Sequence, residues 1–419
     1  MYLAENIKNP PAIRGILRRY YTVWMTYSLA GGFLFGVYPI FLHARGLNQF
    51  EINSVLATYF VVLFLTDVPT GAFADALGRR RSFVLGTSLR VCAFLLYFTA
   101  HHYWVFLIGE SIDGIGTTFG NGAIDAWGVD ALDEAGYVGL KDTLFSRISQ
   151  LTTVGFMISS VGGAYIADID IAWPWLCGAA GYVIAAIIGV CLMTGERPHA
   201  VGVDLAGLPR MIVRRVVEGI SGGFGNRTVL MLSIAGAIQF AAWAPYWLEW
   251  PILFNQSYGV GVWIIGWLYC GLSIARMIGA EVISRLPSDE ASRPGRLAVL
   301  MALAGITLAG AGMLQARPSA AFTFLFVMNI CTGAVTPLLQ SWFNEQIESS
   351  QRATMLSFQS TFGTMGGSVG LFINGMIADR SGVAPAWQFA GMLTLLQIPF
   401  YLAIRPRAER MAIVEPAAK

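Results

Sequence analysis

Charged residues are scarce in this chain of 419 amino acids. Asp, Glu, Lys and Arg together make up 12% of it, whereas a soluble domain carries about a quarter. Hydrophobic residues make up 55%, and the mean hydropathy is +0.60. This composition argues against a water-soluble globular protein and predicts a polytopic membrane protein.

Patterns that bind metals or nucleotides are also missing. The 5 cysteines all fall inside apolar runs without paired spacing, and the 4 histidines lie outside the spans predicted below. We interpret the cysteines as small buried hydrophobic residues. The sequence contains no Walker phosphate loop and no Gly-x-Ser-x-Gly nucleophile elbow. We therefore expect no metal, no cofactor, no enzymatic activity and no nucleic-acid partner.

Long apolar runs are what the chain does contain. A helix needs about 20 apolar residues to cross a lipid bilayer, and the sequence holds twelve candidates. The predicted spans are 20–42, 52–73, 82–100, 104–126, 148–167, 173–193, 228–250, 262–284, 297–314, 320–342, 354–378 and 386–404.

Positive charge lies almost entirely on one side of these spans. The opposite side carries only Arg45, Arg317 and Arg380. By the positive-inside rule, both termini are predicted to be cytoplasmic. We expect a multi-pass protein of the inner (cytoplasmic) membrane.

The longest break between spans predicts the domain organisation. Residues 196–227 are interpreted as a cytoplasmic linker between six-span bundles formed by residues 1–195 and 228–419. Within the linker, the basic amphipathic piece 208–220 is either a helix on the inner membrane surface or a solvated connection. The predicted fold is all-α, with twelve transmembrane helices in two pseudo-symmetric six-helix bundles.

Residues 67–81, DVPTGAFADALGRRR, join the second and third predicted spans. Three consecutive arginines cannot cross hydrocarbon, so a short polar turn is predicted here. Gly71 allows another helix to approach the backbone, and Asp75 can accept hydrogen bonds from the N-terminus of another helix. The alternative is a basic loop that only sets topology.

The pattern G-x-x-x-D-x-x-G-R-R resembles the motif that the major facilitator superfamily carries between its second and third helices. The resemblance implies that this loop acts as a cytoplasmic gate latch and that its arginines pair with Asp125 or Asp130. Arg352-Ala353-Thr354, at the start of the eleventh span, resembles a motif of drug-efflux-like members and suits docking against Asp75. The latch residues implied in the loop itself are Gly71, Asp75, Gly78, Arg79 and Arg80.

The fourth predicted span is the most polar. Carboxylates inside a span are costly and usually mark ion or proton paths. Arg90 in the third span is an obvious partner for them, and Asp67 in the second span lies at a similar depth and competes for it. Either Glu110, Asp113, Arg90 and Asp67 couple transport to protons, or they form a structural ion pair only. The stripe on one face of the fourth span consists of Glu110, Asp113, Thr117, Asn121 and Asp125.

The same span departs from the resembled family. Many proton-coupled members carry R-x-x-x-G-x-G in this helix, whereas here Glu110 stands in the place of the arginine. The resemblance therefore does not extend to arginine-centred coupling. The fifth span has Ile158 and Ser159 where the antiporter motif has Gly-Pro, so antiport is not indicated either.

Polar and aromatic stripes also occur on the first, seventh and tenth spans. In the resembled fold, these helices and the fourth line a central cavity. Taken alone, each aromatic stripe fits core packing or an interfacial belt better, but their coincidence on all four helices favours a substrate cavity. The residues predicted to line it are Tyr27, Tyr38, Thr117, Asn121, Gln239, Trp243, Tyr246, Trp247, Asn329, Thr332 and Thr336.

The combined pattern predicts a secondary active transporter that works by alternating access. We expect a monomer in the lipid bilayer that exports a small amphipathic organic solute, neutral or cationic, with protons as the coupling ion. Proton-driven uptake or facilitated passage of a small metabolite is the alternative within this class. A non-transporting receptor or sensor on the same fold is the alternative from another class.

The predicted orientation can be tested by labelling the loop at residues 76–81. In a background whose native cysteines do not react, we expect Ala76→Cys to be protected from an impermeant maleimide in intact cells and labelled after permeabilisation, because the loop is cytoplasmic. Labelling of this thiol in intact cells would show that the orientation is reversed.

Overall fold

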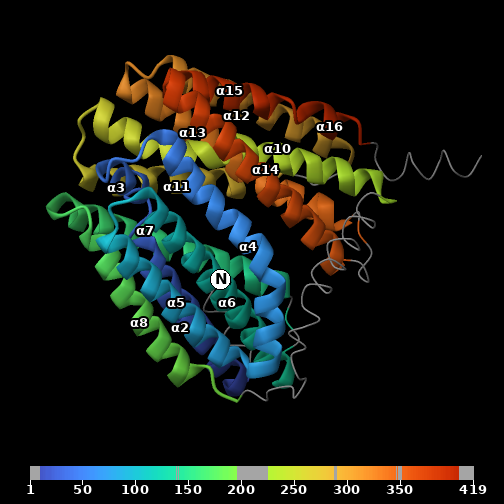
Figure 1. The fold of residues 1–419 in the computed structure, drawn as a ribbon. Helices are drawn as coiled ribbons and strands as arrows, with labels where there is room; N and C mark the ends of the chain where they lie inside the picture. The colour runs from blue at the N-terminus through green and yellow to red at the C-terminus, as the bar shows by residue number, and fades with distance from the viewer. Residues whose placement is uncertain are drawn as a thin grey trace, which may run out of the picture. The chain divides into compact units, whose positions relative to one another are not determined.

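A computed structural model describes residues 10–137, 139, 141–195, 225–286, 290–345, 347 and 352–404. Helices contain nearly all of these residues, and no β-strand occurs in the part of the chain described (Figure 1). The all-helical class predicted from the sequence is confirmed.

The helices follow the predicted spans in order. The first seven are α2 (Pro11–Gly32), α3 (Tyr38–Ala44), α4 (Gln49–Leu77), α5 (Arg79–Thr99), α6 (Tyr103–Glu134), α7 (Lys141–Ile169) and α8 (Trp173–Leu192). After residue 224 come α10 (Arg227–Ile252), a π-helical turn η1 (Leu253–Ser257), α11 (Val262–Ser284), a 3-10 turn η2 (Glu290–Ser292), α12 (Arg293–Met313), α13 (Pro318–Glu345), α14 (Arg352–Ser381), α15 (Val383–Leu395) and α16 (Ile398–Leu402).

Two of the predicted spans are broken rather than continuous: span 20–42 corresponds to α2 with α3, and span 386–404 corresponds to α15 with α16. The span predicted at 228–250 lies within α10, which continues directly into η1. Grouped in this way, the described helices make twelve segments. Among the described residues, 7 helices are long and apolar enough to cross a membrane by length and composition alone.

The polar turn predicted at the three arginines is shorter than expected. α4 continues to Leu77 and Arg79 already begins α5, so Gly78 alone separates the two helices. Gly78 has a φ of +101°, in the left-handed region that favours glycine. One glycine thus supplies the whole turn, and the arginines form the first turn of α5.

The described chain divides into two compact units. The first unit contains residues 10–46, 61–195 and 260–269, and the second contains residues 47–60, 225–259 and 270–404. The first part of α4 therefore belongs to the second unit, and the first part of α11 belongs to the first unit. The linker boundary predicted at residues 196–227 stays a prediction, because residues 196–224 lie outside the described ranges.

These two exchanged segments begin in different ways. At the start of α4, the Asn48 side chain accepts a hydrogen bond from the Glu51 backbone N–H (2.8 Å), and Glu51 Oε2 accepts one from the Asn48 N–H (3.0 Å). This reciprocal pair is a capping box. At the start of α11, the Val262 N–H instead donates to Asp168 Oδ1 on α7 (3.1 Å).

In the first unit, α2, α5 and α8 lie side by side, and α6 packs against α5 (Figure 1). The backbones of α5 and α6 approach closely at Gly86 and Gly116. A Cβ atom on Gly116 would lie 2.8 Å from the carbonyl oxygen of Gly86 and 2.7 Å from Cγ of Arg90. Glycine at this position therefore allows the two helices to meet and leaves room for the Arg90 side chain.

This close approach predicts that Gly116→Ala destabilises the protein. The added methyl group overpacks the contact by about 1–3 kcal/mol, which outweighs the gain of about 1 kcal/mol in helix propensity. Gly122→Ala on the same helix is the matched control, because a Cβ atom there meets nothing within 4 Å. Thermal unfolding in detergent should show a lower midpoint for Gly116→Ala and an equal or higher one for Gly122→Ala. Equal midpoints for the two variants would contradict this account of the α5–α6 contact.

Candidate functional site

A buried ion pair joins α5 to α6 in the first unit. Arg90 Nε donates to Asp113 Oδ1 (2.8 Å), and Arg90 Nη2 donates to Asp113 Oδ2 (3.0 Å). The Arg90 and Asp113 side chains are 12% and 11% exposed. A bidentate geometry of this kind is the arrangement that best offsets the cost of removing both charges from water. Of the two carboxylates predicted to compete for Arg90, Asp113 forms this pair.

Aromatic rings surround the guanidinium of Arg90. Its carbon Cζ lies 4.4 Å from the ring centre of Tyr182, 5.4 Å from that of Tyr27 and 5.8 Å from that of Phe94. Arg90 Nη1 also donates to the Tyr27 hydroxyl oxygen (3.0 Å). Cation–π attraction is strongest where the cation has lost its water, so these rings stabilise Arg90 inside the bundle.

The second carboxylate of α6 is bound differently. Tyr97 on α5 donates its hydroxyl hydrogen to Glu110 Oε2, and the Tyr38 hydroxyl lies 3.5 Å from that of Tyr97. The Tyr97 ring stacks on Trp175 of α8, with ring centres 4.1 Å apart and planes at 10°. Glu110 is 6% exposed, and no ion pair to it is found within the described ranges. The two buried carboxylates of α6 are one helical turn apart and have different partners. Asp113 binds the Arg90 guanidinium, and Glu110 binds the Tyr97 hydroxyl.

The remaining acidic residues named from the sequence lie elsewhere in the first unit. Asp67, on α4, is exposed. Asp125 Oδ1 accepts hydrogen bonds from the Tyr20 hydroxyl (2.7 Å) and from Trp24 Nε1 (3.0 Å), both on α2. Asp125 therefore joins α6 to α2.

The motif residues form a small ion cluster. Arg79 Nη1 lies 2.6 Å from Asp75 Oδ1, and Arg79 Nε lies 3.8 Å from Asp130 Oδ2. Of the two partners predicted for the arginines, Asp130 contacts Arg79. Gly71 and Arg80 are both exposed. Arg352 begins α14, but its side chain lies outside the described part of the structure, so docking of Asp75 there stays a prediction.

The predicted cavity residues of the first unit take part in the network or lie beside it. Tyr27 binds Arg90, Tyr38 lies next to Tyr97, and Thr117 is buried one turn from Asp113. Asn121 differs, because its buried Oδ1 atom has no hydrogen-bond partner among the described residues.

The predicted cavity residues of the second unit lie on α10 and α13. Asn329 Nδ2 donates to the Tyr246 hydroxyl oxygen (3.0 Å), and the Thr332 hydroxyl donates to the Asn329 carbonyl oxygen (3.1 Å). Trp243 is buried, and its Nε1 atom has no partner among the residues described. Trp247 is 40% exposed, and Arg276 of α11 lies over its ring. The two other members are Gln239, which is partly buried, and Thr336, which donates to the Thr332 carbonyl oxygen.

Sequence reasoning missed several residues that contact these groups. Tyr97, Tyr182 and Trp175 stand on apolar helices without a polar stripe, so no pattern marks them. Glu249 of α10 is fully buried, and its Oε2 atom accepts a hydrogen bond from Trp387 Nε1 (2.7 Å). A carboxylate inside an apolar span is itself a signal, and it could have singled out Glu249.

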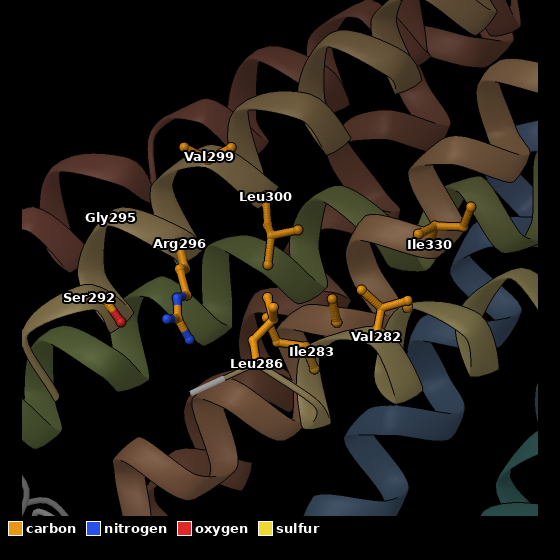
Figure 2. A pocket seen from close by; sticks show the side chains of 11 residues that line it. Val282, Ile283, Leu286, Ser292, Gly295, Arg296, Val299, Leu300 and Ile330 are labelled. Carbon is orange, nitrogen blue, oxygen red and sulfur yellow. The ribbon is translucent and has the colours of Figure 1, made fainter. Parts of the chain in front are cut away.

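An apolar groove lies near the cytoplasmic ends predicted for α11, α12 and α13 in the second unit. Figure 2 shows the aliphatic side chains of Val282, Leu286, Leu300 and Ile330 around it, with Arg296 near the start of α12. Its volume is about 500 Å³. None of the predicted cavity residues lines it, so we do not assign it to the candidate site.

An all-helical fold whose buried polar groups sit inside bundles of long apolar helices is that of a multi-pass membrane protein. The sequence model of the Major Facilitator Superfamily matches residues 22–316. The chain therefore belongs to this superfamily, whose members are transporters.

Individual relatives agree with this assignment. Multidrug resistance protein 2 of Bacillus subtilis (strain 168) is 23% identical over 164 residues, which cover 39% of this chain and 40% of that protein. The uncharacterized MFS-type transporter YxaM of the same organism is 18% identical over 384 residues, covering 90% of this chain and 93% of that protein. The crystal structure of the nucleoside transporter NupG has the same fold, with a TM-score of 0.70, 14% identity, and coverage of 93% of this chain and 98% of that one.

The buried ion pair predicts a strong dependence of stability on Arg90. Arg90→Ala leaves Asp113 buried without its cation, which should lower the free energy of unfolding by about 3–5 kcal/mol. Arg285→Ala is the matched control, because Arg285 makes a similar contact with Glu281 (2.7 Å) while the two side chains are 77% and 62% exposed. Its loss should cost about 0–1 kcal/mol. Unfolding by SDS in mixed micelles measures the free energy of unfolding of both variants. An equal, small decrease in the two would contradict a structural role for the buried pair.

Proposed function

We propose that this chain is a proton-coupled secondary transporter that exports a small amphipathic organic solute by alternating access. The observation that carries the proposal is the buried network of Asp113, Arg90 and Glu110. Membrane-embedded ionisable groups are costly and are found where ions or protons pass. The proposal keeps both termini and the Arg79–Arg81 turn on the cytoplasmic side.

Asp113 is the proposed coupling residue because its charge and that of Arg90 depend on one another. A proton on Asp113 would remove the negative charge that pairs with Arg90 and so weaken the ion pair. Glu110 stands one turn away and is bound by the Tyr97 hydroxyl, which makes it the proposed group that receives the proton from Asp113 or supplies it. A change of helix packing that separates Arg90 from Asp113 would therefore be linked to proton binding, which is what coupling requires.

The proposed solute class follows from the side chains of both units. Trp243 and Trp247 offer aromatic surface, and Asn121 and Trp243 each present a buried polar atom without a partner among the described residues. Such groups suit a ring-bearing compound with a few hydrogen-bonding atoms, neutral or cationic. The name of Multidrug resistance protein 2 supports export over uptake.

The coupling role of Asp113 can be tested in proteoliposomes with a fluorescent aromatic cation such as ethidium as the probe. An imposed pH gradient should drive uphill movement of the probe with the wild type. Asp113→Asn should abolish uphill movement while retaining probe binding and counterflow, because the amide resembles the protonated acid. Glu134→Gln, an exposed position at the end of the same helix, is the control and should transport as the wild type does.

Three other outcomes would each decide between the alternatives. Uphill transport by Asp113→Asn would exclude Asp113 as the coupling site. A variant that unfolds in the SDS assay would favour a purely structural ion pair. Binding of the probe by the wild type without any flux would favour a receptor on the same fold over a transporter.

A further inference from the structure

The second unit contains a buried carboxyl group that the proposed coupling network does not use. Glu249 on α10 is 0% exposed. Its Oε2 atom accepts the hydrogen bond from Trp387 Nε1, whereas its Oε1 atom has no hydrogen-bond partner among the described residues. No ion pair to Glu249 is found there either.

The elements around Glu249 supply no cation to neutralise it. α15 and α16 carry no charged side chain. The acidic and basic residues at the end of α14 are exposed, Glu51 of the α4 segment caps its own helix, and Arg276 of α11 lies over the Trp247 ring. Tyr246 is bound to Asn329. The titratable or charged groups with described side chains on α10, α11, α13, α14, α16 and residues 47–60 of α4, besides Glu249, are Glu51, Tyr59, Arg227, Tyr246, Tyr269, Cys270, Arg276, Glu281, Cys331, Glu345, Asp379, Arg380 and Tyr401.

An ionised carboxylate in this position would be buried beside neutral donors only, the Trp387 indole N–H and the Asn53 side-chain amide, with no cation among the described residues. Such a group is unstable in a low-dielectric interior. The neutral acid carries no charge and so avoids this cost. Trp387 Nε1, which can only donate, is satisfied by the Glu249 Oε2 atom.

One wall of this carboxyl site comes from the exchanged segment of α4, residues 47–60. Asn53 faces the Glu249 carboxyl group, and its Nδ2 atom donates to the Leu371 carbonyl oxygen of α14 (3.2 Å). Phe50 and Phe372 lie 6.2 Å apart between ring centres, and Phe60 and Phe240 lie 5.0 Å apart. The other walls, α10 and α15, belong to the second unit throughout. Separation of the α4 segment is therefore the movement that brings water to Glu249.

We propose that Glu249 is a second proton-binding site, which holds its proton while residues 47–60 of α4 pack against α10 and α14. Loss of the proton releases this segment, because an ionised Glu249 requires water. This proposal requires neither the solute nor Asp113, so its test is independent of the test of the proposed function.

Hydrogen exchange of the purified protein without solute measures this linkage directly. Protection factors for backbone amides of residues 47–60, corrected for intrinsic exchange rates, report how often the segment separates. If one proton is lost on separation, protection should fall by about tenfold per pH unit above the ordinary pKa of an exposed glutamate, about 4.3. Glu249→Gln should make the protection independent of pH. Asp379→Asn, an exposed carboxylate on neighbouring α14, should keep the wild-type slope.

Protection factors of residues 47–60 that do not change with pH in the wild type would overturn the proposal. A dependence of protection on pH in Glu249→Gln as steep as in the wild type would also overturn it. Should Glu249→Gln fail to fold, infrared spectroscopy of the wild type and Trp387→Phe provides the second test. We expect a carbonyl band from a protonated carboxyl group that shifts in Trp387→Phe, because this substitution removes the Nε1 donor and leaves a smaller aromatic ring in its place. The absence of such a band in the wild type, or a band unchanged by this substitution, would also overturn it.

Discussion

The cost of holding an ionised side chain away from water governs the interior of this protein. In the first unit, this cost is met by pairing, since Asp113 binds Arg90 through both oxygens and aromatic rings enclose the guanidinium. Glu110 and Glu249 have no ion pair among the described residues, and each accepts a hydrogen bond from an aromatic side chain. The three buried carboxyl groups therefore differ in how the protein accommodates them.

The sequence departs from the family pattern at Glu110, and the structure has an arginine on the neighbouring helix α5. The resemblance implies an arginine on the fourth span, and here the cation stands on α5 while α6 supplies the carboxylates. The glycine retained at position 116 provides the space in which the Arg90 side chain reaches Asp113. The two adjacent helices are thus joined by opposite charges, with the arginine on α5 and the carboxylate on α6.

Sequence reasoning predicted the parts of this structure that are marked in the sequence by a periodic pattern or by charged residues. The spans, the glycine before Arg79 and the pairing of Arg90 with Asp113 all follow from apolar length, from charge and from depth in the membrane. The partners of Glu110 could not be predicted, because the stretches around Tyr97 on α5 and Trp175 on α8 are apolar in sequence. Such stretches have no preferred face in the sequence, so their rotation is decided by packing alone. The same holds for the contact between Trp387 and Glu249, which are 138 residues apart.

The different starts of α4 and α11 give the two exchanged segments different mechanical properties. α4 carries its own cap in Asn48 and Glu51, so its first turn keeps those hydrogen bonds wherever the segment moves. α11 takes its cap from Asp168 of α7, and withdrawal of that carboxylate leaves the Val262 N–H without this acceptor. The cap of α4 is therefore contained within its own first turn, whereas that of α11 depends on its packing against α7.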